Sequence, residues 1–333
     1  MKKSALILSG GSVKGCFQAG AIQYVVESGF LPDSIYGTSV GSLNGSFLTN
    51  AAGKLMQSKN SKDKLNQQEW NSIAQQLVDY WKNNIQKPAD VVTQRGKISD
   101  IIHIITNKFK GLSDTTPVYN KIDKLLDVTA MQYAAPALEL RVATVDFICS
   151  QMIYASPFDT GDKDFISCLK GSMAIPVAMP PFVLDKGNKH QVLFDGGVRA
   201  VAPLGQAIND NAVNIVGILC QADELEVYSD FHEQKLISLV ERTQDIIVNQ
   251  NVKNDTHFAN IISQIKQEAI NKGITNLDSL NKYALVESLI IQPSKEIKIS
   301  IEDFNTADIS KGIQDGYDTA KKIMTANPVQ WII

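Results

Sequence analysis

Several features that would restrict the function are missing from this sequence. It has no run of about 20 apolar residues, which argues against a membrane-spanning helix. Its formal net charge of −3 gives no basic excess, so we expect no nucleic-acid partner. Neither a metal-ligand cluster nor a cofactor signature occurs, and we expect no metal and no cofactor. The four cysteines form no CxxC pair, which favours reduced thiols in the core: Cys16, Cys149, Cys168 and Cys220.

The start of the chain, MKKSALILSGGSVKGC, looks superficially like a secretory leader. Its apolar part, Ala5 to Leu8, is much shorter than the roughly 7–15 residues that the apolar region of a leader requires. We therefore expect a first strand here and a cytoplasmic protein, with export by a leaderless route left open.

Composition and pattern indicate an α/β protein. The chain has 333 residues, of which 44% are hydrophobic and 20% charged, as in globular proteins with a full core. Its first 53 residues read as strand–turn–helix twice over, which is typical of a sheet covered by helices. We expect a three-layer α/β/α fold with a mostly parallel central sheet. Residues 1–205 are predicted to form the core and residues 206–333 to complete the same domain with strands and helices.

A helical insertion is predicted at about residues 54–130, where Lys, Gln and Asn become frequent. Two of its pieces are amphipathic, WNSIAQQLVDYW and IIHIITNKF, and residues 228–272 also have a helical pattern. Each of these segments either packs on the domain or covers a site, and the sequence leaves both alternatives open. Later strands are predicted in ELRVATVDFICSQMIYAS, VLFDGG, AVNIVGILCQA and ALVESLIIQPS, with a closing helix in TADISKGIQDGYDTAKKIMT.

The segment GTSVG, Gly37 to Gly41, fits the pattern G-x-S-x-G between a predicted strand and a helix of small residues. In such a turn the glycines make room, and the serine stands exposed at the start of a helix. The partial positive charge of the helix end favours a developing negative charge on its oxygen. Ser39 is therefore a candidate nucleophile.

A second glycine-rich turn, GGSVKG, follows the first predicted strand. Successive N–H groups in such a turn bind anions, and the oxyanion of acyl transfer needs such donors. We expect Gly10, Gly11 and Ser12 to form an oxyanion hole. The turn also serves chain reversal. Lys14 either adds positive potential at the site or is a solvated helix residue.

A nucleophilic serine needs a base. None of the four histidines follows a strand in a glycine-bounded turn: His103, His190, His232 and His257. Asp195 instead ends an apolar run and precedes two glycines, LFDGG. The carboxyl ends of strands are where open α/β sheets place their sites, so Asp195 is either the base or a turn-capping residue.

GGSVKG, GTSVG and DGG, in that order, together resemble the patatin-like phospholipase family over residues 5 to about 205. The segment KGSMAIPVAMPPF is similar to the proline-bounded stretch that precedes the aspartate in that family. The resemblance implies a patatin-like fold and a calcium-independent acyl hydrolase with a Ser39–Asp195 dyad. It also implies supporting roles for the other motif residues: Lys14, Gly15, Gly37, Gly41, Gly196 and Gly197.

The implied substrates are acyl esters of phospholipids, lysophospholipids or neutral lipids, with transient contact to a membrane surface left open. The sequence does not indicate the oligomeric state. It departs from the family at Ser12, where a third glycine is usual, and after DGG, where Val201 and Ala202 occupy the region of a usual asparagine.

Two other interpretations stay open. One is a lipid-binding or scaffolding protein with a weakened site, which the two departures favour. The other is an α/β-hydrolase-type esterase in which His232 or His257 is the base. A dinucleotide-binding loop is disfavoured, because GGSVKG lacks the middle glycine of G-x-G-x-x-G.

Overall fold

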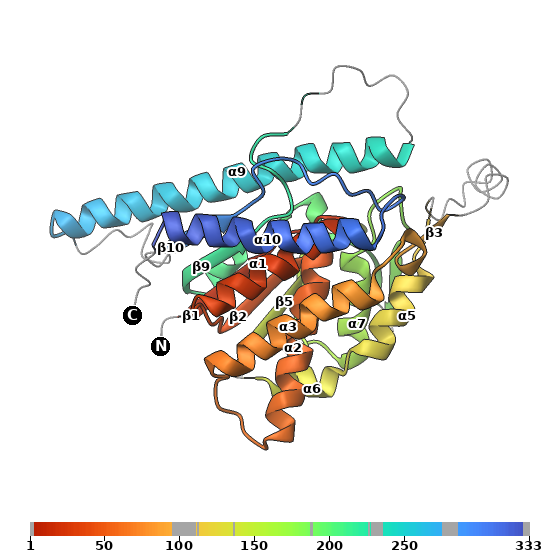
Figure 1. Cartoon of the computed structure of the whole chain (residues 1–333), viewed down its shortest axis with the longest axis horizontal. Helices are drawn as coiled ribbons and strands as arrows, with labels where there is room; N and C mark the ends of the chain where they lie inside the picture. The colour runs from red at the N-terminus through yellow and green to blue at the C-terminus, as the bar shows by residue number, and fades with distance from the viewer. Residues whose placement is uncertain are drawn as a thin grey trace.

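The centre of the molecule is an eight-stranded sheet with helices on both faces (Figure 1). This computed structural model describes residues 3–94, 111, 113–135, 137–186, 189–225, 227, 236–274 and 286–328. The sheet order is β10–β9–β1–β2–β5–β8–β7, and β6 pairs with β5 outside this path. Its strands are β1 (Lys3–Leu8), β2 (Ser34–Thr38), β5 (Glu139–Asp146), β6 (Gln151–Ala155), β7 (Phe182–Lys186), β8 (Lys189–Asp195), β9 (Ala212–Ile218) and β10 (Glu287–Ile291).

Strand direction divides the sheet into two parts. β10, β9, β1, β2 and β5 run parallel, whereas β6, β7 and β8 join by antiparallel pairing. β1 is buried on both sides from Ala5 to Leu8, as an apolar central strand should be. This architecture confirms the predicted α/β fold. A separate two-stranded pair joins β3 (Thr93–Gln94) to β4 (Ser113–Asp114).

Helices cover the two faces unequally. One face carries the larger core, to which seven helices contribute: α1 (Gly15–Glu27), α2 (Val40–Ser58), α3 (Gln67–Asn84), α5 (Thr116–Leu125), α6 (Val128–Tyr133), α7 (Asp162–Ser172) and α10 (Thr306–Ala326). The other face has a smaller core under α8 (Leu204–Asn209). The long α9 (Leu236–Asn271) also crosses this side, and α10 lies beside α1 (Figure 1). Three short 3-10 turns complete the elements: η1 (Ser12–Lys14), η2 (Pro88–Asp90) and η3 (Gly196–Val198).

The helix α3 shows how sequence fixes one element of this layer. Asn66 accepts a hydrogen bond from the Glu69 N–H while the Glu69 side chain accepts from the Asn66 N–H, which satisfies two free donors at the helix start. Its buried residues recur at helical spacing and pack into the larger core: Trp70, Ile73, Ala74, Leu77, Val78 and Trp81. The segment WNSIAQQLVDYW is therefore a packed helix. The other proposed cover, IIHIITNKF, lies outside the described residues.

Two strands meet end to end along one edge of β5. Val142 and Ala143 pair with both β2 and β6, so these two strands lie on opposite edges of β5. Thr144 pairs with both β6 and Asp195 of β8, so β8 lies on the same edge as β2. Because β2 runs parallel and β8 antiparallel to β5, their carboxyl ends face each other. The residues that follow β2 and end β8 are thereby brought together.

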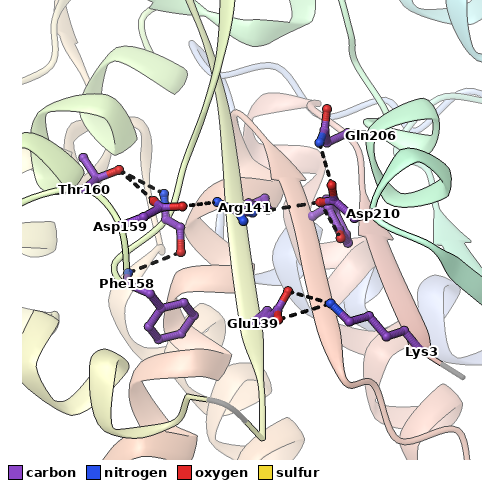
Figure 2. Close-up of polar contacts among 10 residues, drawn as sticks. Lys3, Glu139, Arg141, Phe158, Asp159, Thr160, Gln206 and Asp210 are labelled. Atoms are coloured by element: carbon purple, nitrogen blue, oxygen red, sulfur yellow. Dashed lines mark hydrogen bonds and ion pairs between the residues drawn. The ribbon is translucent and has the colours of Figure 1, made fainter. Parts of the chain in front are cut away.

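Charged residues form a network toward the amino ends of the strands (Figure 2). Lys3 pairs with Glu139 at 3.1 Å, and Arg141 lies between Asp159 at 2.5 Å and Asp210 at 4.0 Å. The Tyr36 hydroxyl donates to Asp210 at 2.9 Å. These charges are paired with one another on the part of the sheet away from the carboxyl ends of β1 and β2.

The division into residues 1–205 and 206–333 stays a prediction; β9 and β10, from the second part, lie in the same sheet as β1. The start of the proposed insertion, Lys54, falls inside α2. Three of the cysteines are buried as expected, but Cys149 is exposed in the turn between β5 and β6. Among the described helices, none is both long and apolar enough to cross a bilayer.

Candidate active site

Ser39 lies in the strained turn between β2 and α2. Its backbone has φ 54° and ψ −124°, a conformation that non-glycine residues seldom adopt. The turn is also tight: a Cβ on Gly41 would lie 2.2 Å from the Leu8 carbonyl oxygen, and a Cβ on Gly37 would lie 2.5 Å from that of Gly41. The two glycines of the motif are thus needed for close backbone approach. They hold Ser39 at the amino end of α2.

The N–H of Ser39 is bound by a residue of α7. It donates to the Ser172 hydroxyl at 2.9 Å, and that hydroxyl donates to the Ala143 carbonyl at 2.6 Å. Ser172 is fully buried. The turn that carries Ser39 is therefore fastened both to α7 and to β5.

Asp195 ends β8 beside this turn and is 4% exposed. One carboxylate oxygen accepts the Gly197 N–H at 2.7 Å. Burial raises the pKa of Asp195 to about 6, although hydrogen bonding from the nearby Ser39 side chain and from the Gly197 N–H opposes the rise. The structure thus brings together the two side chains that the motifs single out, and the aspartate has the higher proton affinity that a base requires.

The glycine turn after β1 lies against Ser39. A Cβ on Gly10 would be 3.2 Å from the Ser39 Cβ, and a Cβ on Gly11 would be 2.3 Å from that of Cys220. The N–H of Gly10 donates to the Val201 carbonyl at 3.1 Å. Of the three residues expected to form an oxyanion hole, Gly10 thus has its N–H already engaged, and the N–H groups of Gly11 and Ser12 stay candidates.

Val201 lies in the region after DGG where the patatin-like family usually has an asparagine. It is buried, and it joins the Asp195 loop to the glycine turn through its backbone carbonyl, which any residue supplies. A second tie runs from the Thr38 hydroxyl to the Ala200 carbonyl at 2.9 Å. The Asp195 loop is thus held to both turns of the site without an asparagine side chain.

Lys14 and Gly15 connect the glycine turn to the surrounding helices. The Lys14 ammonium pairs with Asp245 of α9 at 3.0 Å, and both side chains are mostly buried. A Cβ on Gly15 would lie 2.2 Å from a methyl group of Val40. Gly196 has a similar role, because its Cβ would lie 2.5 Å from the Ala143 carbonyl oxygen. Lys14 is therefore a partly enclosed residue at the site and not a solvated one.

A cavity of about 430 Å³, within the usual range for ligand sites, opens onto Ser39 and Asp195. The glycine turn and α9 both contribute residues to its wall. Most of the wall is apolar: Ile175, Pro176, Val177, Val198, Val201, Leu239, Ile247 and Ile299. The position of α9 answers the question left open by the sequence for this segment, since the amino-terminal part of α9 borders the cavity.

A second, smaller cavity of about 40 Å³ adjoins the same serine. It is walled by apolar side chains of the larger core, among them Trp81, Val118 and Met179. Three residues border both cavities: Ser12, Ser39 and Ile175. Ser39 and Ser12 therefore stand where the two cavities come closest.

Neither described histidine lies at the site. His190 is an exposed residue of β8 paired with Asp185, and His257 is exposed on α9. His103 and His232 lie outside the described residues. Within the described part of the chain, no group of three or more His, Cys, Asp or Glu side chains could hold a metal ion.

Sequence reasoning missed two parts of the site. The sequence gives only a weak signal that Ser172 belongs to the site, because a serine in a segment of small residues is compatible with many structural roles. The partnership of Asp245 with Lys14 joins residues 231 positions apart and leaves no local pattern.

Three comparisons relate the chain to known proteins. A search of curated proteins gives no match. Among solved structures, the crystal structure of VipD from Legionella pneumophila is similar at 15% identity and a TM-score of 0.44, over 98% of this chain and 67% of that one. The family model described as patatin-like phospholipase matches residues 6–208, which is more than half of the chain. The chain therefore belongs to the patatin-like phospholipase family, a family of lipid acyl hydrolases.

Proposed function

We propose that this protein is a serine acyl hydrolase that cleaves carboxylic ester bonds of lipids, of lipase, phospholipase A or lysophospholipase type. The observation that carries the proposal is that Ser39 and Asp195 lie together beside one largely apolar cavity. A nucleophile with its base in reach is the arrangement that acyl transfer needs. The apolar wall suits a fatty acyl chain.

In the first half of the proposed reaction, the Ser39 oxygen attacks the ester carbonyl carbon and Asp195 takes the hydroxyl proton. The carbonyl electron pair moves onto its oxygen, which the N–H groups of Gly11 and Ser12 stabilise. The intermediate then collapses and the bond to the alcohol breaks. Asp195 gives its proton to the departing alcohol, and an acyl group remains on Ser39.

In the second half, water takes the place of the alcohol. Asp195 accepts a proton from water as the water oxygen attacks the acyl carbon. Collapse of the second intermediate breaks the bond to Ser39, and the proton returns to the serine oxygen. The products are a carboxylic acid and the free enzyme. A carboxylate is an effective base for this task only if its pKa is raised. Burial raises the pKa of Asp195.

We further propose that the mouth of the cavity makes transient contact with a lipid surface. Four large apolar residues on its wall are between 41% and 49% exposed: Val177, Val198, Leu239 and Ile247. Exposed apolar residues gathered at one opening mark interaction sites. We call these four residues the apolar rim. They would let an acyl chain pass from a lipid surface to Ser39 without crossing water.

The direct test is hydrolysis of a short-chain p-nitrophenyl ester by the wild-type protein and by Ser39→Ala. We expect turnover in the wild type and its loss in the variant, with unchanged thermal unfolding. A fluorophosphonate probe should label Ser39 and no other serine, as shown by peptide mass mapping.

Two results would count against this function. If Ser39→Ala retained turnover, another group would be the nucleophile. If the wild type bound lipid vesicles without hydrolysing any of their esters, and Ser39→Ala bound them equally well, the protein would be a lipid-binding module instead. A screen of vesicles containing phospholipid, lysophospholipid or neutral lipid would identify the substrate class.

A further inference from the structure

Two buried serine hydroxyls, those of Ser12 and Ser46, have no hydrogen-bond partner among the described residues. Such a group is unfavourable, because it has left water without gaining a replacement. Ser46 lies within α2 and borders neither cavity at Ser39. Ser12 borders both. Of these two residues, Ser12 lies beside the space at the nucleophile and Ser46 does not.

Ser12 has a second unfavourable feature. Its φ of 53° lies in the left-handed region, which glycine adopts more easily than serine. A glycine here would remove both the strain and the unpartnered hydroxyl. Residues that combine strain with an unused polar group are found preferentially at functional sites. The presence of a serine at position 12 therefore indicates that its side chain has a function that glycine could not perform.

The chemistry at Ser39 supplies an acceptor for this hydroxyl. When Ser39 bonds to an ester carbon, the carbonyl oxygen becomes negative and must lie close to Ser39. Ser12 and Ser39 border the same two cavities, so that oxygen forms within the space that both residues share. A serine hydroxyl can turn its hydrogen toward whichever acceptor arrives. Hydrogen bonds to a charged oxygen are short and strong.

We propose that the Ser12 hydroxyl donates a hydrogen bond to this oxyanion, in addition to the N–H groups of Gly11 and Ser12. The inference rests on the proposed function and identifies one more catalytic group in it. Ser12 shares its proton and keeps it throughout, while Asp195 carries the proton of Ser39. In the resting protein this hydroxyl has no hydrogen-bond partner in the part of the chain that the structure describes, so its full interaction forms only as charge develops on the substrate oxygen.

The test compares Ser12→Gly, Ser12→Ala and Ser46→Ala with the wild type, using kcat and KM for a p-nitrophenyl ester. Both Ser12 variants should lower kcat by roughly 10²–10³-fold, the loss typical of one oxyanion donor. KM should stay nearly constant, because the bond forms only after attack. The rate of fluorophosphonate labelling at Ser39 should fall in parallel. Ser46→Ala should keep full activity, and none of the three should unfold at a lower temperature than the wild type.

Ser12→Gly decides the outcome, because glycine keeps the backbone N–H and accommodates the left-handed φ. Activity of Ser12→Gly equal to that of the wild type would overturn the proposal, even if Ser12→Ala were slow. If the wild type were inactive, or if Ser39→Ala were active, the proposed function would fail and this inference with it. If the wild type and Ser12→Gly were equally active and Ser39→Ala were inactive, the proposed function would stand and only the role of the Ser12 hydroxyl would be refuted.

Discussion

The N–H of Ser39 donates to the hydroxyl of Ser172, which in turn donates to the Ala143 carbonyl. Ser172 has a single hydrogen, so in its 2.9 Å contact with the Ser42 hydroxyl the donor must be Ser42. One buried hydroxyl thus accepts two hydrogen bonds and donates one. This relationship fixes the strained turn that carries the proposed nucleophile.

Ser172→Ala should disturb this turn. It leaves the buried Ser39 N–H without an acceptor, which costs about 1–3 kcal/mol, and we expect a matching loss in the free energy of unfolding from urea titration. Turnover should fall as well, because Ser39 loses a support. Ser167→Ala on the same helix is the matched control, since the Ser167 hydroxyl donates to the Lys163 carbonyl of its own helix and does not contact the Ser39 turn. Equal effects of the two variants on turnover would contradict the role given to Ser172.

The pH dependence of turnover should report Asp195. As a base it must be ionised, and burial sets its pKa at about 6. We therefore expect kcat/KM to rise with pH through an apparent pKa of about 6 and to reach a plateau above pH 7. An acid limb near pH 4, the range of an unperturbed carboxyl group, would mean that Asp195 is solvated in the free enzyme.

Stability should respond to the same group with a defined sign. The pKa of Asp195 is raised in the folded state, so the unfolded chain loses this proton first, and stability falls as pH rises from about 4 to about 6. A rise from 3.8 to about 6 corresponds to about 3 kcal/mol above pH 6. Asp195→Asn should therefore be inactive, equal to the wild type in stability near pH 4, and more stable at pH 8.

Asp146→Asn provides the contrasting control. Burial raises the pKa of Asp146, but hydrogen bonds from the Ile148 N–H, Cys149 and others outweigh it and hold the pKa below its usual value. This variant should lose stability at neutral pH instead of gaining it. Urea titrations of both variants at pH 4 and pH 8 measure the difference, and loss of stability at pH 8 in both would refute the assignment.

Contact of the apolar rim with lipid can be tested at Val177. This residue is 49% exposed and has a φ of 71°, a strained value for a β-branched side chain. Val177→Asp should keep the protein folded, since aspartate tolerates this conformation better, and should weaken hydrolysis of vesicle lipid several-fold. Val183→Asp is the control, because Val183 is 45% exposed on β7 and does not border the cavity. Hydrolysis of a monomeric p-nitrophenyl ester should change little in both variants.

The sequence predicts the parts of this site that depend on short segments. The turns around Ser39 and Gly10 follow apolar strands, and their glycines show directly where the backbone must pass closely. The sequence marks Asp195 as the end of a strand, but the rule for parallel strands does not apply to β8, which is antiparallel to β5. Its position depends on the short overlap of β8 with β5, which pairs only three residues of each strand. Pairing at that range has no signature in the residues themselves.

Two other contacts at the site also leave no local signature in the sequence. One is the hydrogen bond from the Gly10 N–H to the Val201 carbonyl, and the other is the ion pair of Lys14 with Asp245. Each joins residues more than 180 positions apart, and each depends on how loops and helices pack after the sheet forms. The local pattern identified the candidates but could not tell which N–H groups remain available for a substrate.

The end-to-end meeting of β2 and β8 ties the proposed chemistry to the register of one strand. If β8 shifted by one residue along β5, Asp195 would turn to the opposite face of the sheet, and Leu193, which is fully buried in the larger core, would turn with it. A change of register that separates the aspartate from the serine should therefore also cost stability. The same apolar packing that folds β8 keeps its terminal carboxylate in place.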